Sequence, residues 1–164
     1  MFRAGIITVS DKGAQGQRED LSGPAIAEML AGAAFSITRT VIVPDEIGQI
    51  ADAIIEFADR ERLDLILTTG GTGVSPRDLT PEATLRVLDK EIPGMAEAMR
   101  YSGMMVTPHA MLSRAVAGVR GNSLIINLPG SPKGATENLA AIRPSLSHAI
   151  SKIQGDQSDW AAPV

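Results

Sequence analysis

Residues 63–82 read LDLILTTGGTGVSPRDLTPE, and this stretch sets the expected fold of the chain. Leu63–Leu67 is a short apolar run of the kind that forms a buried strand. A loop with three glycines follows, and Thr80-Pro81 then supplies the capping hydroxyl and the proline that are typical of a helix start. A strand, a glycine loop and a helix in this order indicate an open α/β sheet, in which ligands bind at the carboxyl ends of the strands.

The glycine loop itself has two readings. Its glycines let the backbone come close to a ligand, and their N–H groups can form a nest for phosphate. A tight turn without a ligand is the alternative. The added threonines, together with Arg77 and Asp78, favour the ligand reading. The candidate phosphate-binding residues of the loop are therefore Gly70, Gly71, Thr72 and Gly73.

The rest of the chain alternates between expected strands and helices. Strands are expected over residues 5–10 and 40–43, and over 113–120 and 123–128, the last two joined as a hairpin at Gly121-Asn122. Apolar spacing predicts helices that begin near residues 20, 47, 80, 93 and 132. The helix after Thr80 is expected to carry Leu85, Leu88 and Ile92, and Pro144 should kink or split the last helix.

This order predicts a three-layer α/β/α sandwich with a mainly parallel sheet and one late hairpin. Residues 1–154 are expected to form a single domain, and the polar segment 155–164 a mobile tail.

The amino-acid composition excludes several kinds of functional site. The 164 residues include no cysteine, which excludes disulfides and thiolate chemistry, and two histidines are too few for a histidine metal cluster. Any metal would be a hard cation such as Mg²⁺, held by carboxylates and phosphates. The net charge of −4 argues against a nucleic-acid surface. We also expect no signal peptide and no membrane span, and hence a cytoplasmic protein.

Polar loops follow several of the expected strands: Ser10-Asp11, Asp45, the glycine loop with Asp78, and Pro129-Gly130. In a parallel sheet these carboxyl ends share one edge, so we expect the side chains to converge on one pocket suited to Mg²⁺ and a polyphosphate. Blander readings remain open, because Asp45 and Asp78 could be helix caps and Ser10-Asp11 an ordinary turn. A Walker A loop and a dinucleotide-binding glycine motif are both absent.

The motifs together resemble a known family. Residues 69–73 (TGGTG) followed by 76–84 (PRDLTPEAT) are similar to the signature of the molybdopterin adenylyltransferases, which include bacterial Mog-type proteins and the matching domains of gephyrin and its plant counterpart. The likeness covers nearly the whole chain, in order, through residues 9–11, 22–24, 43–46, 111–115 and 126–133.

The resemblance implies Mg²⁺-dependent transfer of AMP from ATP to the terminal phosphate of molybdopterin, with release of pyrophosphate. It also implies a homotrimer and a transient contact with the enzyme that inserts molybdenum. Two alternatives remain open: a non-catalytic paralogue that binds molybdopterin, and a scaffolding domain.

Residue roles follow from the same resemblance. Asp45 and Asp78 correspond to the catalytic aspartates and are the candidate Mg²⁺ ligands. Ser113 matches a pterin-binding serine, and Arg77 and Arg114 are also expected at the pterin. On physical grounds, Lys133, Arg77 and Arg114 are candidates for offsetting the remaining negative charge. The nucleotide-binding edge would consist of Ser10, Asp11, Gly70, Gly71, Thr72, Gly73, Pro129 and Gly130.

Overall fold

The computed structural model describes residues 1–32 and 34–157, so most of the predicted tail, residues 158–164, lies outside the described residues. Within these residues, six strands form one sheet in the order β2-β1-β3-β6-β5-β4. The neighbouring pairs among β2, β1, β3 and β6 are parallel, whereas β5 pairs antiparallel with both β6 and β4. The strands are β1 (Phe2–Val9), β2 (Phe35–Val43), β3 (Leu65–Thr69), β4 (Lys90–Glu91), β5 (Ala117–Arg120) and β6 (Ser123–Leu128).

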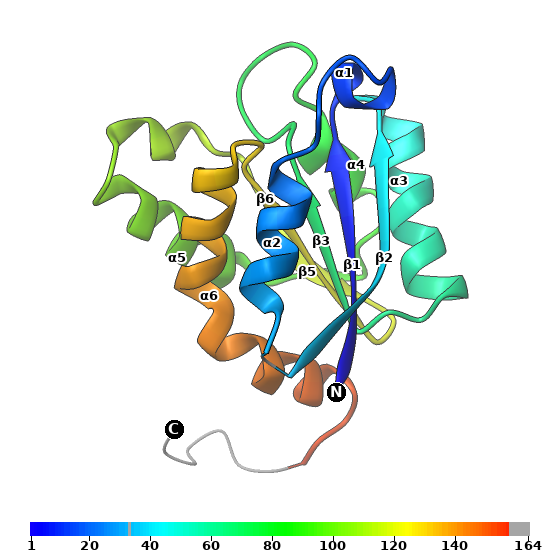
Figure 1. Ribbon diagram of the computed structural model, residues 1–164. Helices are drawn as coiled ribbons and strands as arrows, with labels where there is room; N and C mark the ends of the chain where they lie inside the picture. Colours follow the sequence, from blue (N-terminus) through cyan, green and yellow to red (C-terminus); the bar gives the residue numbers. More distant parts are fainter. Residues whose placement is uncertain (33, 158–164) are drawn as a thin grey trace.

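Helices cover both faces of this sheet, which confirms the predicted three-layer arrangement (Figure 1). One face carries α2 (Ser22–Leu30), α5 (Pro93–Met104) and α6 (Pro132–Ile153). The other face carries α3 (Ile47–Ile55), its π-helical continuation η1 (Glu56–Arg60), and α4 (Thr80–Leu85). Two short elements complete the fold, α1 (Asp11–Ala14) and the 3₁₀ helix η2 (Pro108–Leu112). Within the described residues, no helix is both long and apolar enough to cross a membrane.

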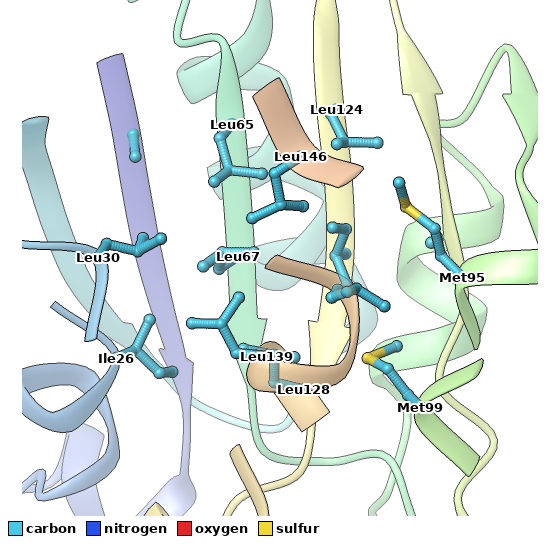
Figure 2. Packing of buried hydrophobic residues seen from close by; sticks show 14 of the residues in the cluster. Ile26, Leu30, Leu65, Leu67, Met95, Met99, Leu124, Leu128, Leu139 and Leu146 are labelled. Atoms are coloured by element: carbon cyan, nitrogen blue, oxygen red, sulfur yellow. The ribbon is translucent and has the colours of Figure 1, made fainter. Parts of the chain in front are cut away.

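Strands β3 and β6 are buried along their whole length, and most of their residues are apolar because both faces of the sheet are covered. Successive side chains point to opposite faces, so Leu65 and Leu67 pack with α2, α5 and α6, while Ile66 packs with α3 and α4. Figure 2 shows the first of these clusters, with leucines of α6 lying over β3 and β6. Burial of each such side chain contributes about 1.5–3 kcal/mol.

The helix after Thr80 differs from the prediction. It ends at Leu85, whose side chain is 45% exposed, and Val87 is buried in its place. The chain leaves the helix because residues 89–92 pair with β5, where the N–H of Asp89 donates to the Val119 carbonyl at 2.8 Å. Sheet pairing therefore overrides the helical spacing of Leu85, Leu88 and Ile92.

Three further boundaries differ from those expected. A short helix, α1, occupies the start of the predicted polar loop after β1, and β5 begins at Ala117 rather than Ser113. The residues before β5 instead reach the glycine loop, where the N–H of Arg114 donates to the Thr72 carbonyl at 2.8 Å. Pro144 does not split the last helix: α6 is continuous, and its ribbon changes direction in its C-terminal part (Figure 1).

Candidate functional site

A pocket of about 620 Å³ lies at the carboxyl edge of the parallel strands. This volume is in the range of small-molecule sites. The predicted site residues Ser10, Asp45, Gly70, Gly71, Asp78 and Gly130 all line it, so the structure brings the strand ends together. Its other walls come from the chain between β1 and α2 and from the start of α6, where the Ser131 hydroxyl accepts a hydrogen bond from the Gly134 N–H and caps the helix.

The glycine loop has a backbone that other residues adopt only with strain. Gly70 and Gly71 have φ values of +105° and +66°. A Cβ atom at Gly70 would overlap with the Val9 carbonyl oxygen, and one at Gly71 would overlap with the Thr80 hydroxyl. The glycines are therefore required by the close approach of β1 and α4 to the loop.

The loop also leaves a run of backbone donors without a protein partner. Its carbonyls at Thr72 and Gly73 accept hydrogen bonds from the Arg114 backbone N–H at 2.8 Å and from Arg114 Nε at 2.7 Å. By contrast, the N–H groups of Gly71, Thr72 and Gly73 donate to no acceptor among the described residues. Because protein N–H groups rarely lack an acceptor, a run of free donors beside a pocket is suited to bind an anion.

The Thr80 side chain binds the backbone of this loop and, contrary to the prediction, does not cap the helix. The N-cap of α4 is Leu79, and the Thr80 hydroxyl donates instead to the Gly70 carbonyl at 2.8 Å. The Thr84 hydroxyl in turn donates to the Thr80 carbonyl, and Asn127 Nδ2 donates to the Thr84 hydroxyl, at 2.8 and 2.9 Å. These buried polar groups fix α4 and β6 behind the glycine loop.

Asp45 is tied to Asp11 by a pair of reciprocal bonds. The backbone N–H of Asp11 donates to Asp45 Oδ2 at 2.9 Å, and the backbone N–H of Asp45 donates to Asp11 Oδ1 at 3.0 Å. The N-cap of α3 is Glu46 rather than Asp45. Asp45 is therefore held at the pocket by the loop after β1, and the reading of Asp45 as only a helix cap is wrong.

The surroundings of Asp45 disfavour its negative charge. Burial raises the pKa of the Asp45 carboxyl, and the nearby charges of Asp11 and Asp78 raise it further against the lowering effect of the Asp11 N–H bond. A site of this kind is suited to a bound cation. Asp78 Oδ2 accepts from the Ser75 N–H at 2.9 Å, which leaves its second oxygen available.

Arg77 joins three of the strand-end loops. Its Nε and Nη2 donate to the Asp11 carboxylate at 2.6 and 3.0 Å, and Nη2 also donates to the Asp45 carbonyl at 3.2 Å and to Glu46 Oε1 at 2.9 Å. The hydrogen bonds from Arg77 lower the pKa of Asp11, and those to Asp11 and Glu46 raise the pKa of Arg77. The guanidinium thus fixes the position of Asp45 through Asp11.

The Arg114 guanidinium is also hydrogen-bonded within the protein. Its Nη2 donates to the Asp78 carbonyl at 2.6 Å, its Nη1 donates to Glu82 Oε1, and its Nε binds the Gly73 carbonyl. The hydrogen bond from Arg114 lowers the pKa of Glu82. Arg114 therefore braces the segment that carries Asp78.

Seven of the predicted residues lie outside the pocket lining: Asp11, Thr72, Gly73, Arg77, Ser113, Arg114 and Pro129. Ser113 Oγ accepts from the Ala115 N–H at 3.3 Å, and the Pro129 carbonyl accepts from the Thr69 hydroxyl at 2.7 Å. The roles of Ser113, Arg77 and Arg114 at the pterin stay predictions.

Several lining residues were not singled out from the sequence: Thr8, Gly13, Arg18, Glu19, Asp20, Ser22 and Ser131. Asp20 accepts bonds from the Thr8 hydroxyl at 2.7 Å and from the Gly23 N–H at 2.9 Å, so it secures the start of α2. The sequence could have indicated these residues only by their place in the chain. The segment that links β1 to α2 must pass the carboxyl edge of the sheet, where the pocket lies.

Comparison with known proteins identifies the family. Residues 5–148 match the family described as a "probable molybdopterin binding domain". The chain belongs to this family. A molybdopterin adenylyltransferase of Helicobacter pylori (strain J99) is 43% identical over 154 residues, covering 93% of this chain and 88% of the relative. Gephyrin of Dictyostelium discoideum is 43% identical over 159 residues, which cover 91% of this chain but 22% of gephyrin.

A solved structure agrees with both the fold and the family. The molybdopterin biosynthesis enzyme MoaB of Thermus thermophilus superimposes with a TM-score of 0.91 at 58% identity, over 95% of this chain and 98% of that protein. These comparisons confirm the resemblance that the motifs indicated, including the fold.

The raised pKa of Asp45 gives a testable pH dependence. The pKa of the Asp45 carboxyl is higher in the folded state than in the unfolded state. The contribution of this group to folding stability is therefore fully present below the unfolded-state pKa, and it is lost as the pH rises through the folded-state pKa. We therefore expect Asp45→Asn to be at least as stable as the wild type at pH 7, by urea denaturation. The matched change Asp11→Asn should lower stability, since the pKa of Asp11 is lowered.

Proposed function

We propose that the chain transfers AMP from ATP to the terminal phosphate of molybdopterin, as a step of molybdenum cofactor biosynthesis. The curated relatives that carry the name molybdopterin adenylyltransferase support this activity. The structural observation that carries the proposal is the run of N–H groups at Gly71–Gly73, which have no acceptor in the described part of the chain and lie beside a pocket lined by Asp45 and Asp78.

The reaction needs positioning more than covalent chemistry from the protein. An oxygen of the pterin phosphate attacks the α-phosphorus of ATP, and the bond from that phosphorus to the bridging oxygen breaks. The electron pair leaves with pyrophosphate. The glycine loop donors would hold phosphate oxygens, and Arg77 and Arg114 would keep the loop and both aspartates in place.

Magnesium fits the donor set only together with the substrate. Among the described residues, no three carboxylates or histidines lie close enough to hold a metal by themselves. Asp45 and Asp78 would hold Mg²⁺ jointly with phosphate oxygens, and Mg²⁺ prefers that combination of ligands. When bound, it would neutralise charge on the phosphates. Without a cation, the two carboxylates would repel both anionic substrates.

The terminal phosphate of molybdopterin would approach from the side of Ser113. We assign Ser113 to the pterin because it matches the pterin-binding serine of the family, and its segment runs from η2 to the glycine loop, where Arg114 is anchored. Arg77 and Arg114 would then act on the pterin phosphate by their charge, since their hydrogen bonds are largely used within the protein. The product would pass to a metal-inserting enzyme, and an ATP-dependent reaction of this kind is suited to the cytoplasm.

We also propose that the chain forms a homotrimer through an exposed apolar patch. Exposed apolar side chains gather at the end of α5 and in η2, the segment that projects from the sheet in Figure 1. Met105 is 68% exposed and Tyr101 66% exposed, whereas Met95 and Met99 of the same helix are buried in the core. The apolar patch consists of Tyr101, Met104, Met105, Val106, Met111 and Leu112.

The trimer proposal predicts the effect of a charge in this apolar patch. Met105→Asp should shift the protein from trimer to monomer in analytical ultracentrifugation, because an unpaired carboxylate would be buried in the interface. Leu85→Asp is the matched control, since Leu85 is exposed on α4 at the opposite face. A Met105→Asp variant that sediments like the Leu85→Asp control would contradict this interface.

The activity is tested by incubating the protein with molybdopterin, ATP and Mg²⁺. The expected products are adenylated molybdopterin and pyrophosphate in equal amounts.

A further inference from the structure

The charged residues that line the pocket include four carboxylates, Glu19, Asp20, Asp45 and Asp78, and a single basic group, Arg18. The proposed substrates are both phosphate anions. Two like-charged partners repel each other when they are brought together in one pocket, so a positive group there favours their binding. Arg18 is the basic side chain that the described pocket supplies.

Of the other basic residues near the site, Arg77, Arg114 and Lys133 have partners within the protein, and Lys12 does not line the pocket. Arg77 and Arg114 bind loop carbonyls and carboxylates, and Lys133 lies 3.8 Å from Glu137 and does not line the pocket. Arg18 is exposed, and among the described residues it makes no hydrogen bond or ion pair. Its guanidinium therefore keeps all of its donors for a ligand.

The backbone on either side of Arg18 is nonetheless held. The N–H of Gln17 donates to the Lys12 carbonyl at 2.8 Å, and the Asp20 carboxylate binds the Thr8 hydroxyl and the Gly23 N–H. A free side chain on a fixed backbone loses less conformational freedom when it binds than one on a loose loop.

We propose that Arg18 binds the phosphate chain of the nucleotide, an inference that rests on the proposed function. Arg18 shares the pocket with Ser10 and Gly71, which belong to the predicted nucleotide-binding edge, whereas Ser113 does not line it. Arginine is suited to this role because its planar fork binds two phosphate oxygens at once.

Calorimetric titrations with Mg²⁺ present test this role. Arg18→Ala should weaken binding of ATP and of inorganic tripolyphosphate about 10- to 100-fold, the range expected for hydrogen bonds to a charged group. Arg18→Lys should lose less, because it keeps the charge but not the fork. Arg60→Ala is the matched control, since Arg60 is exposed and also lacks a partner among the described residues. Arg60 comes before the amino end of β3, whereas the pocket lies at the carboxyl end of that strand.

The outcomes separate the two phosphate sources. Arg18→Ala that binds ATP like the Arg60→Ala control would overturn the inference. So would a variant that loses affinity for molybdopterin but keeps affinity for ATP and tripolyphosphate, because Arg18 would then bind the pterin phosphate. If Arg18→Ala loses ATP affinity but the wild type forms no adenylated pterin, the inference stands and the proposed function fails.

Discussion

Asp45→Asn and Asp78→Asn should each lower the rate of pterin adenylation by at least about 10²-fold without unfolding the protein. The amide keeps one oxygen, so it can still accept the bond from the Asp11 N–H or from the Ser75 N–H. The charge is lost, and with it the electrostatic stabilisation of the phosphates, an effect of roughly 10²–10³-fold for a preorganised group. Single-turnover rates of adenylated pterin formation give the measurement.

Asp52→Asn is the matched control for these variants. Asp52 lies on α3, is exposed, and does not line the pocket. It should adenylate molybdopterin at the wild-type rate, and all three variants should still bind molybdopterin. Either pocket variant with a rate equal to that of Asp52→Asn would remove that aspartate from the catalytic pair.

Gly70→Ala should be the most damaging single change to stability among the loop variants. Its φ of +105° strains any other residue, and the added Cβ would overlap with the Val9 carbonyl, a backbone group of β1 that cannot move freely. Strain of this kind costs about 1–3 kcal/mol, to which the overlap adds. We expect a loss of at least about 3 kcal/mol in the free energy of unfolding, measured by urea denaturation.

Gly121→Ala separates the two causes. Gly121 has φ of +54° in the β5–β6 turn, and nothing lies near its added Cβ. It should therefore cost about 1 kcal/mol, from backbone strain alone. Equal losses for the two variants would mean that β1 does not constrain the glycine loop.

The sheet and its binding edge could be predicted because they depend on local patterns. The apolar run at Leu65–Leu67, the glycine loop and the prolines that begin helices each act within a few residues of sequence. The parallel connections then bring the strand ends to one edge. This reasoning was sufficient to place Asp45 and Asp78 in the same pocket.

Features that depend on pairing between distant segments could not be read in this way. The early end of α4 follows from pairing of residues 89–92 with β5, and the exchange of bonds between Asp11 and Asp45 joins two loops 34 residues apart. Arg18 is a similar case, since an arginine in a polar loop has no pattern that distinguishes it from a solvent-exposed side chain.

Formation of adenylated molybdopterin tests the central claim most directly. The purified chain would be incubated with molybdopterin, Mg²⁺ and ATP labelled at the α-phosphate, and the pterin product separated and counted. We predict labelled adenylyl-molybdopterin in amounts that match the pyrophosphate released, formed at least about 10²-fold more slowly with Asp78→Asn. Molybdopterin that stays bound to the wild-type protein without acquiring label would contradict the account and indicate a non-catalytic molybdopterin-binding protein.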